Sequence, residues 1–415
     1  MKAIWKLATL IVLVSMLAAC AAPAAAPTAE PAAPVEPAAT AEPAATAEPV
    51  LTAQEQWLKD NQLGPYETEP QDWAAIEAAA KQEGTVLVYA NSSKIEKAAA
   101  KFMELYPEIK VEGYDLGGDD VYLKTVEEQK AGAFTGDVWF SSGGPNIKGE
   151  LIPKQYLWRF VPDEDKDVVP AELTDPLLTA RFGVRVLAYN KELNPDGCPV
   201  SNLWELTNPE WKGKVHIEDP LNDASTLGIL MTIAYHADDM AAAYKELYGS
   251  DPVLDADTPD AGWLWLKRFA QNNPIPEPGG DEVDSAFATP GMTDNLLGFT
   301  SYSNYPDVLD GALAFEPCWT VKPVVGVQTQ AYLGIMNQAP HPNAAKMFIR
   351  FALTEEGADP WMKIGNYLPR TDIPAPEGAL PLEEIRNITY VYQDGYVYDN
   401  VIQARDFYLL NLGSK

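Results

Sequence analysis

Short apolar runs alternate with amphipathic stretches along the first part of the chain's body. Residues 85–89 (TVLVY) form a β-branched apolar run typical of a buried strand. Asn and Ser follow at 91–93, and apolar residues then recur at helical spacing until Pro107. Residues 109–111 and 137–140 (DVWF) indicate two further strands, with a second helical stretch between them. This alternation predicts an α/β fold, with mostly parallel sheets and flanking helices.

The N-terminus has a different pattern. Lys2 and Lys6 precede an apolar run over residues 7–16, which is too short to cross a bilayer as a helix. Small residues then lead to Cys20, as in a secretory signal. A Cys directly after Leu-Ala-Ala resembles the bacterial lipobox, which implies a lipid anchor on Cys20 and a place on the outer face of the cell membrane. An ordinary cleaved signal with a Cys nearby is the alternative.

The segment after Cys20 is of low complexity. Residues 21–50 consist almost entirely of Ala, Pro, Thr and Glu, and PAATAE occurs at 37–42 and again at 43–48. Proline fixes φ and disfavours helix at the preceding residue, so we expect an extended, polyproline-like tether.

Composition limits the number of domains and the kinds of partner that the remaining body can have. The chain has 415 residues, of which 47% are hydrophobic, enough for roughly two globular domains after the signal and tether. Its formal net charge is −30, which would repel phosphate backbones, so no nucleic-acid partner is expected. The same charge could attract cationic solutes or could serve only solubility.

Several segments of the body matter together, in this order: residues 84–89, 106–111 (YPEIKV), 136–138 (GDV), 182–190 (FGVRVLAYN), 204–214 (WELTNPEWKGK) with 218–220 (EDP), 340–348 (PHPNAAKMF) and 355–357 (EEG). Together they resemble the solute-binding proteins of bacterial ABC importers, and within these the branch of ferric-iron, thiamine, polyamine and phosphonate binders. The resemblance implies a two-lobed periplasmic-binding-protein-like fold of type II, in which hinge crossovers join the lobes and a solute binds between them.

On this basis we expect the following division of the chain: a lipoprotein signal peptide at 1–19, a tether at 20–50, a helical lead-in at 51–83, lobe 1 at 84–187 plus 323–370, lobe 2 at 188–322, and a tail packing on the body at 371–415.

Candidate ligand contacts follow from the ends of the expected strands, where ligands of open α/β sheets bind. Helix starts there offer free N–H groups and a positive dipole end. The candidates are Asn91, Ser92, Ser93, Ser141, Ser142, Asp219, Ser225, Tyr302 and Tyr305. Plain helix capping is the alternative for Asn91, Ser92 and Ser93. For Ser141 and Ser142, and for Asp219, the alternative is an ordinary turn.

Tyr302 and Tyr305 fall near the place where ferric-iron binders of this branch carry paired tyrosines. Those tyrosines are adjacent and often accompanied by a His in the first loop, whereas this chain has Tyr-Ser-Asn-Tyr and Asn-Ser-Ser. Asp294-Asn295 also replaces the usual Gly-Glu. We therefore expect aromatic cleft walls and no metal, with Tyr302 and Tyr305 as ligands only if iron binds.

Two cysteines remain if Cys20 carries lipid. Cys198 and Cys318 would then be the only pair outside the cytosol, where disulfides persist. A bridge between them and two separate buried thiols both remain open.

The expected function is an extracellular solute-binding receptor of an ABC importer, not an enzyme. HExxH and GxSxG are absent, and the three histidines are far apart. The expected partners are a small solute, a permease, and the membrane through Cys20; no cofactor is expected, and the chain should be a monomer. The alternatives are a ferric-iron-binding protein of the same fold, or a lipid-tethered protein that binds or hydrolyses glycans. Iron, a polyamine, an oxyanion, a sugar and a vitamin all remain open as ligands.

Overall fold

The structure is a computed structural model that describes residues 51–413. The expected signal peptide, the tether and the lipidation site Cys20 lie outside the described residues.

A single twelve-stranded mixed sheet organises the body. Its main order is β2-β1-β3-β10-β5-β8-β6-β7, and four short strands pair beside β5 and β10. The outer strands run parallel to one another in each half, whereas β10 and β5 run antiparallel to each other. The main strands are β1 (Thr85–Ala90), β2 (Lys110–Asp115), β3 (Val138–Ser141), β5 (Leu178–Asn190), β6 (Val215–Glu218), β7 (Ile275–Glu277), β8 (Leu297–Ser301) and β10 (Gly326–Met336), and the short ones are β4 (Leu157–Trp158), β9 (Phe315–Pro317), β11 (Asn366–Tyr367) and β12 (Thr389–Val391).

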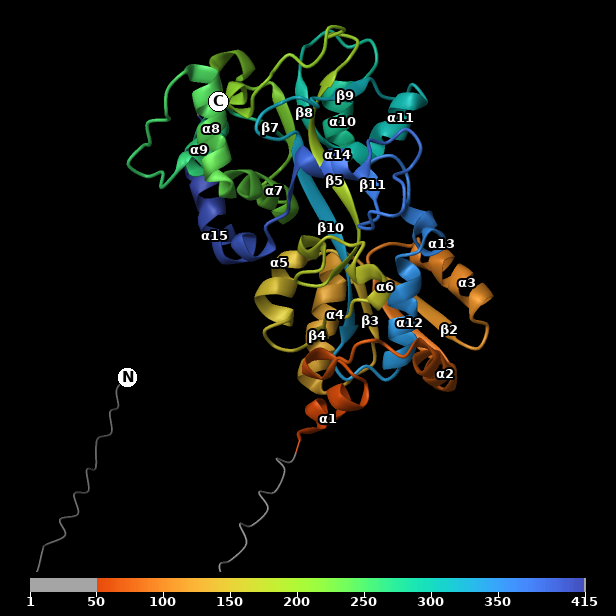
Figure 1. The fold of residues 1–415 in the computed structure, drawn as a ribbon. Helices are drawn as coiled ribbons and strands as arrows, with labels where there is room; N and C mark the ends of the chain where they lie inside the picture. The colour runs from red at the N-terminus through yellow and green to blue at the C-terminus, as the bar shows by residue number, and fades with distance from the viewer. Residues whose placement is uncertain (1–50, 414–415) are drawn as a thin grey trace, which may run out of the picture. The chain divides into compact units, whose positions relative to one another are not determined.

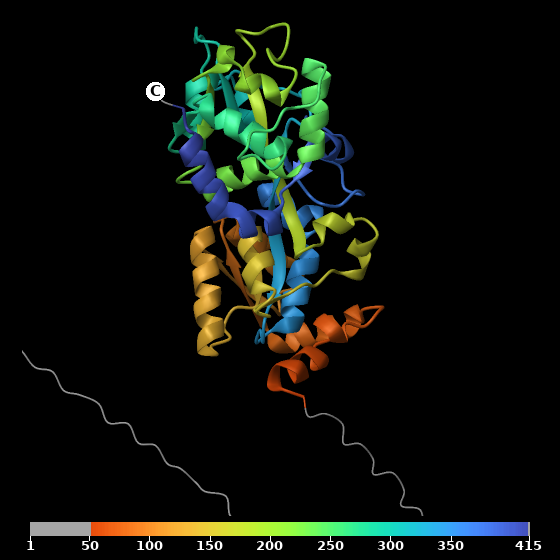
Figure 2. The ribbon, with the colours of Figure 1, turned by 90° about the vertical axis from the view of Figure 1, so that its left-hand side faces the viewer.

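Strands β5 and β10 join the two halves of the body (Figures 1 and 2). At 13 residues, β5 spans about 40 Å. It pairs with β8 at one end and, along most of its length, with β10, which in turn pairs with β3. We call β1–β4 and their helices the first half, β6–β9 and their helices the second half, and β5 with β10 the crossover strands.

Helices cover both faces of the first-half sheet. One face packs against α2 (Trp73–Glu83), α3 (Ile95–Leu105) and α12 (Pro342–Ala352), and the other against α4 (Gly118–Ala131) and α5 (Gly144–Asn146). Alternation along the strand explains the two cores, because Val86 and Val88 enter the first and Tyr89 the second. The short helices α1 (Ala53–Asp60), α6 (Asp163–Lys166) and α13 (Glu355–Ala358) complete this half.

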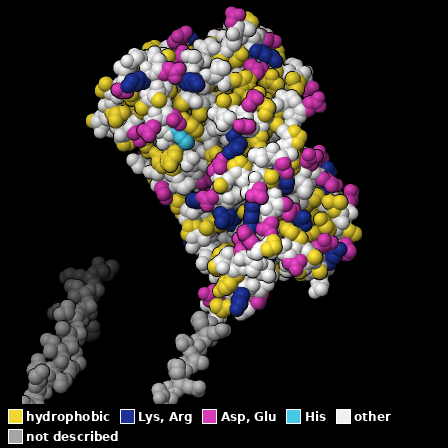
Figure 3. Space-filling model, viewed as in Figure 1, with side chains coloured by type: hydrophobic (Ala, Val, Ile, Leu, Met, Phe, Trp, Pro, Cys, Tyr) yellow, Lys and Arg dark blue, Asp and Glu magenta, His cyan; other side chains and the backbone are white. Residues whose placement is uncertain are grey.

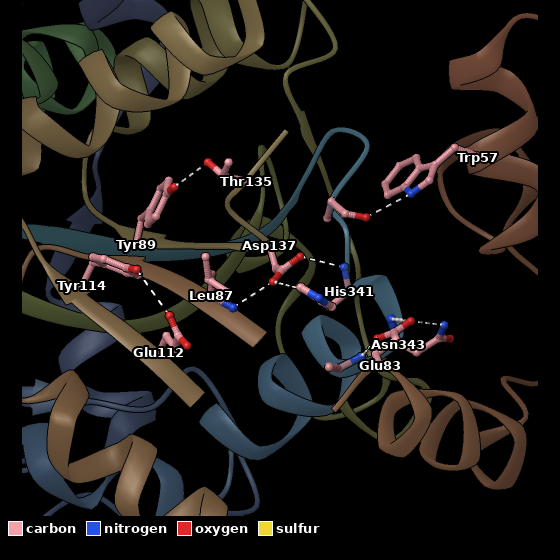
Figure 4. Close-up of polar contacts among 12 residues, drawn as sticks. Trp57, Glu83, Leu87, Tyr89, Glu112, Tyr114, Thr135, Asp137, His341 and Asn343 are labelled. Atoms are coloured by element: carbon pink, nitrogen blue, oxygen red, sulfur yellow. Dashed lines mark hydrogen bonds and ion pairs between the residues drawn. The ribbon is translucent and has the colours of Figure 1, made fainter. Parts of the chain in front are cut away.

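A buried carboxylate fixes the start of β3. Asp137 is fully buried and accepts hydrogen bonds from the backbone N–H groups of Leu87 and His341, each at 2.8 Å (Figure 4). These contacts tie β1, β3 and the start of α12 together.

The second half has the same two-sided cover. Helices α7 (Ala224–Tyr235), α8 (Ala237–Tyr248) and α9 (Ala261–Gln271) form one layer, and α10 (Gly280–Ala288) and α11 (Tyr305–Leu309) lie on the other side. Cys198 and Cys318 are joined by a disulfide, with a Cα–Cα distance of 5.2 Å.

The C-terminal tail contacts both halves. After α14 (Leu382–Asn387), helix α15 (Asp394–Asn411) packs against α7 and α9 and also against α5 of the first half. No helix within residues 51–413 combines the length and the apolar character that crossing a membrane requires. Shorter helical turns are Gly64–Tyr66, Ile147–Leu151, Ala171–Leu173, Leu203–Thr207, Pro209–Trp211, Tyr302–Asn304 and Asp359–Trp361.

Candidate functional site

The ends of β1 and β3 bring three of the sequence-predicted residues together. Asn91 Nδ2 donates to Ser142 Oγ at 3.0 Å, and Ser92 Oγ accepts from the indole N–H of Trp361 at 3.2 Å. All three candidate side chains are only partly buried. Ser93, next along the chain, is exposed. These hydroxyl and amide groups stand where a parallel sheet offers its ligand site.

Ser141 does not join this group. It pairs with Tyr332 of β10, and its side chain shares that face of the sheet, opposite Phe140. Its hydroxyl is buried and has no hydrogen-bond partner. The side chains of Ser141 and Ser142 therefore lie in different environments although the two residues are adjacent in sequence.

Arg181 of β5 is a candidate site residue that the sequence did not suggest. Its guanidinium lies over the ring of Trp361, 5.8 Å from the ring centroid, and its Nε has no hydrogen-bond partner. Burial lowers the pKa of Arg181 to about 10. Among the described residues, no carboxylate lies within ion-pair distance of it, although a buried charge is normally paired. The sequence held one signal for Arg181. Arg181 and Arg185 lie four residues apart on a strand, so their side chains share a face of the sheet.

Two lysines add positive charge beside Arg181. The pKa of Lys94 is lowered, first by burial and then by the nearby charges of Lys363 and Arg181. Lys94 directly precedes α3, so Ser92 and Ser93 lie beside it at the same helix start. Figure 3 shows acidic side chains spread over one face of the molecule, with basic ones interspersed. Against a net charge of −30, this gathering of three cations is a local exception suited to an anion.

The second half contributes an ion pair at the end of β6. Arg185 Nη2 lies 2.6 Å from Glu218 Oε1. Burial raises the pKa of Glu218, a contact with Asp223 raises it further, and Arg185 opposes both. A Cβ placed on Gly280 would lie 2.9 Å from Glu218 Oε1, so the start of α10 approaches this pair closely.

Asp219 and Ser225 have local roles in this structure. Asp219 accepts from the N–H of Leu221 at 3.0 Å, which is the turn geometry that was the alternative for this residue. Asp223 caps α7 by accepting from the N–H of Ser225 at 2.6 Å, and the Ser225 side chain is exposed.

Tyr302 and Tyr305 pack as aromatic side chains. The Tyr302 ring centroid lies 5.4 Å from that of Tyr305 and 5.0 Å from that of Trp319. The Tyr305 hydroxyl donates to Glu316 at 2.8 Å. Burial raises the pKa of Tyr302 to about 12 and raises that of Tyr305 as well, so both phenols are neutral near pH 7. Within residues 51–413, no group of three or more His, Cys, Asp or Glu side chains could hold a metal ion.

Comparison with known proteins gives one family match. Residues 176–377 match the model of the family described as bacterial extracellular solute-binding protein. That family consists of binding receptors rather than enzymes. The matched segment begins just before β5 and includes β10 and the whole second half. No curated protein matches the sequence.

Solved structures share the fold at low sequence identity. Iron-bound HitA from Pseudomonas aeruginosa is 18% identical, with a TM-score of 0.58, and the match covers 78% of this chain and 99% of that chain. Apo ferric ion-binding protein A from Pasteurella haemolytica is 16% identical, with a TM-score of 0.56 and coverage of 79% and 98%. The ferric binding protein from Campylobacter jejuni is 15% identical, with a TM-score of 0.56 and coverage of 79% and 99%. The α/β fold expected from the sequence is confirmed.

Proposed function

Because residues 176–377 match the model of the bacterial extracellular solute-binding protein family, we propose that this chain is the receptor of an ABC importer and captures a small anionic solute between its two halves. The observation that carries the choice of an anion is Arg181, a partly buried side chain whose buried Nε has no hydrogen-bond partner and which has no carboxylate partner among the described residues. An oxyanion would supply the missing charge and the missing acceptor together.

The surrounding groups suit such a ligand. Lys94 and Lys363 add charge, and Ser92, Asn91 and Ser142 offer polar side chains at the same edge of the sheet. The charge of Arg185 is already neutralised by Glu218, so of the two arginines on this face of β5 only Arg181 lacks a carboxylate partner among the described residues. Carboxylate, phosphonate, phosphate and sulfate groups all fit this description.

Capture would work through the crossover strands. A solute that contacts Arg181 and both halves stabilises the arrangement in which the halves lie close together, and a permease can distinguish that arrangement from the empty one. We further propose that acylated Cys20 holds the receptor at the outer face of the cell membrane.

A thermal-shift screen tests the proposal. Sulfate, phosphate, phosphonoacetate, citrate and short carboxylates are added to the full chain at constant ionic strength, with sodium chloride as the balance. At least one should raise the melting temperature, because a ligand that binds only the folded state stabilises it. Arg181→Gln should weaken binding of that anion by roughly tenfold to a hundredfold, the value of a hydrogen bond to a charged group.

The matched control is Lys212→Gln, which removes one exposed positive charge on the second half. Equal losses for Arg181→Gln and Lys212→Gln would mean that only overall charge matters, and would contradict the proposed site. Ferric citrate belongs in the same screen. Stabilisation by ferric iron that Tyr302→Phe abolishes would instead favour the iron-binding alternative.

A further inference from the structure

A cavity of about 340 Å³ lies on the other face of the crossover strands. Arg181 pairs with Ala331, so Gln330 and Tyr332, the neighbours of Ala331 on β10, point to the face away from the proposed anion site. The register of β5 shifts between Arg181 and Thr179, so Thr179 pairs with Tyr332 and shares that opposite face. We call this space the crossover cavity, and the lining residues used below are Thr179, Gln330, Tyr332, Tyr392, Asp394 and Tyr396. Its volume is within the range of small-molecule sites.

Two polar side chains in this cavity lack partners. Gln330 is 7% exposed, and neither its Nε2 nor its Oε1 makes a hydrogen bond. Thr179 is 1% exposed, and its hydroxyl also has no partner. A buried amide is nearly always satisfied, so an amide with both ends free indicates a group that belongs beside it. Gln330 can both donate to and accept from such a group.

The charges around the cavity are balanced except at one carboxylate. Lys148 pairs with Asp175, and Arg386 pairs with Glu172, so those lining acids are neutralised. Asp394 accepts a hydrogen bond from the Tyr332 hydroxyl, and no Lys or Arg of the described residues lies within ion-pair distance of it. Tyr332, Tyr392 and Tyr396 supply aromatic surface to the same space.

We propose that the crossover cavity binds a small organic cation, with its ammonium group against Asp394 and the tyrosine rings and with its hydrogen-bonding group on Gln330. Tyrosine faces attract ammonium groups through their quadrupole, most strongly where water is excluded. The site is separate from the proposed anion site, because the two lie on opposite faces of the crossover strands.

The electrostatics of Asp394 fit this assignment. Burial raises its pKa to about 7, while the Tyr332 hydroxyl and Lys148 act to lower it and Asp175 acts to raise it. A bound ammonium would favour the ionised carboxylate, so proton and cation compete for Asp394.

Isothermal titration of the full chain with choline at pH 8 tests the proposal, with 3,3-dimethylbutan-1-ol as the neutral analogue of the same shape. Choline should bind saturably and at least tenfold more tightly than the neutral analogue. Between pH 8 and pH 6 its affinity should fall about tenfold, because a carboxyl with a pKa near 7 is about 90% protonated at pH 6.

Three variants separate binding from folding. Gln330→Leu should lose choline binding yet melt no lower than the unchanged chain, because the amide that it removes has no partner. Asp394→Asn should bind choline and the neutral analogue equally. Arg181→Gln should bind choline with unchanged affinity. This variant therefore separates a wrong anion-site proposal from a wrong crossover-cavity proposal.

Other results would overturn the inference. Choline and butylamine both failing to bind at millimolar concentration and pH 8 would exclude a cation site. Full choline binding by Gln330→Leu would place the cation elsewhere.

Discussion

The ring Nδ1 of His341 lies 2.9 Å from the carboxylate of Asp137, although 204 residues separate them in the chain. The same carboxylate also accepts hydrogen bonds from the backbone N–H groups of Leu87 and His341 (Figure 4). This one buried side chain holds β1, β3 and the start of α12 together.

Asp137→Asn should therefore destabilise the protein although it conserves size. The amide nitrogen of Asn cannot accept, so at least one donor loses its partner, at a cost of about 1–3 kcal/mol. Urea unfolding at pH 7 measures the loss. Asp399→Asn, at an exposed position on α15, is the matched control and should change stability by less than about 0.5 kcal/mol. Equal stabilities for the two variants would contradict this role for Asp137.

Glu218→Gln should strengthen binding of the anionic solute. The substitution removes a carboxylate from the strand end and releases Arg185 from its 2.6 Å ion pair. A second free guanidinium on the face of Arg181 should tighten binding by roughly tenfold, the value of one charge-assisted contact. Titration of the best anion from the screen measures this. Glu210→Gln, which removes an exposed acid nearby in sequence, should leave the affinity unchanged. Weaker binding by Glu218→Gln would show that the ion pair itself positions the solute.

Arg370→Met should destabilise the protein, and more so at high pH. Asp165 is fully buried, and its Oδ1 lies 2.5 Å from Arg370 Nη1. Burial raises the pKa of Asp165 to about 6, above its unfolded value, so the stability contributed by this group is highest below about pH 4 and is lost as pH rises through 6. Without Arg370 that pKa rises further, and the deficit should reach about 3–5 kcal/mol at pH 8 but be small at pH 5.

Unfolding of the Arg370→Met variant at the two pH values checks this dependence. Asp372→Asn is the control, because it removes only the exposed partner of Arg370. A deficit that is independent of pH would mean that Arg370 acts through packing alone.

Replacing both Cys198 and Cys318 by Ser should lower stability substantially. The bridge links residues 120 apart, for which the chain-entropy model gives about 4–5 kcal/mol. The melting temperature of the double variant, with and without reductant, measures the effect. Reductant should lower the melting temperature of the unchanged chain and leave that of the variant unaffected. Alkylation of Cys198 and Cys318 in the denatured, unreduced chain would show that the bridge does not form.

Much of the first half could be predicted from local pattern. The TVLVY run forms β1, the DVWF run contains β3, and helix α3 ends before Pro107 as expected. These elements follow from periodicity and proline chemistry within a few residues of sequence. The division into lobes at 84–187 with 323–370 and at 188–322 remains a prediction. The position of β10 between β3 and β5 depends on long-range pairing, which local pattern does not encode.

Part of the grouping of candidate side chains could be predicted, for a physical reason, while their role as ligand contacts remains a prediction. Asn91, Ser92 and Ser142 lie together because strand ends meet at one edge of a sheet. Ser141 points to the other face, because side chains alternate along a strand. Arg181 and Gln330 were missed because a polar residue in a strand normally faces solvent, and only the packing around β5 and β10 shows that Gln330 and the Arg181 Nε are buried. The lipid on Cys20 remains a prediction.

The position of β10 also has a consequence for synthesis. All four residues of β3 are buried, yet the strand that covers one edge of it begins only at Gly326. Strands β1 to β3 therefore leave the ribosome long before β10 has been synthesised. During that interval, the edge of β3 that β10 later covers is open and apolar. Nascent chains that stop before Gly326 should be prone to aggregation and sensitive to proteases. A chaperone that binds unfolded chains would protect them until the last quarter of the chain has been synthesised.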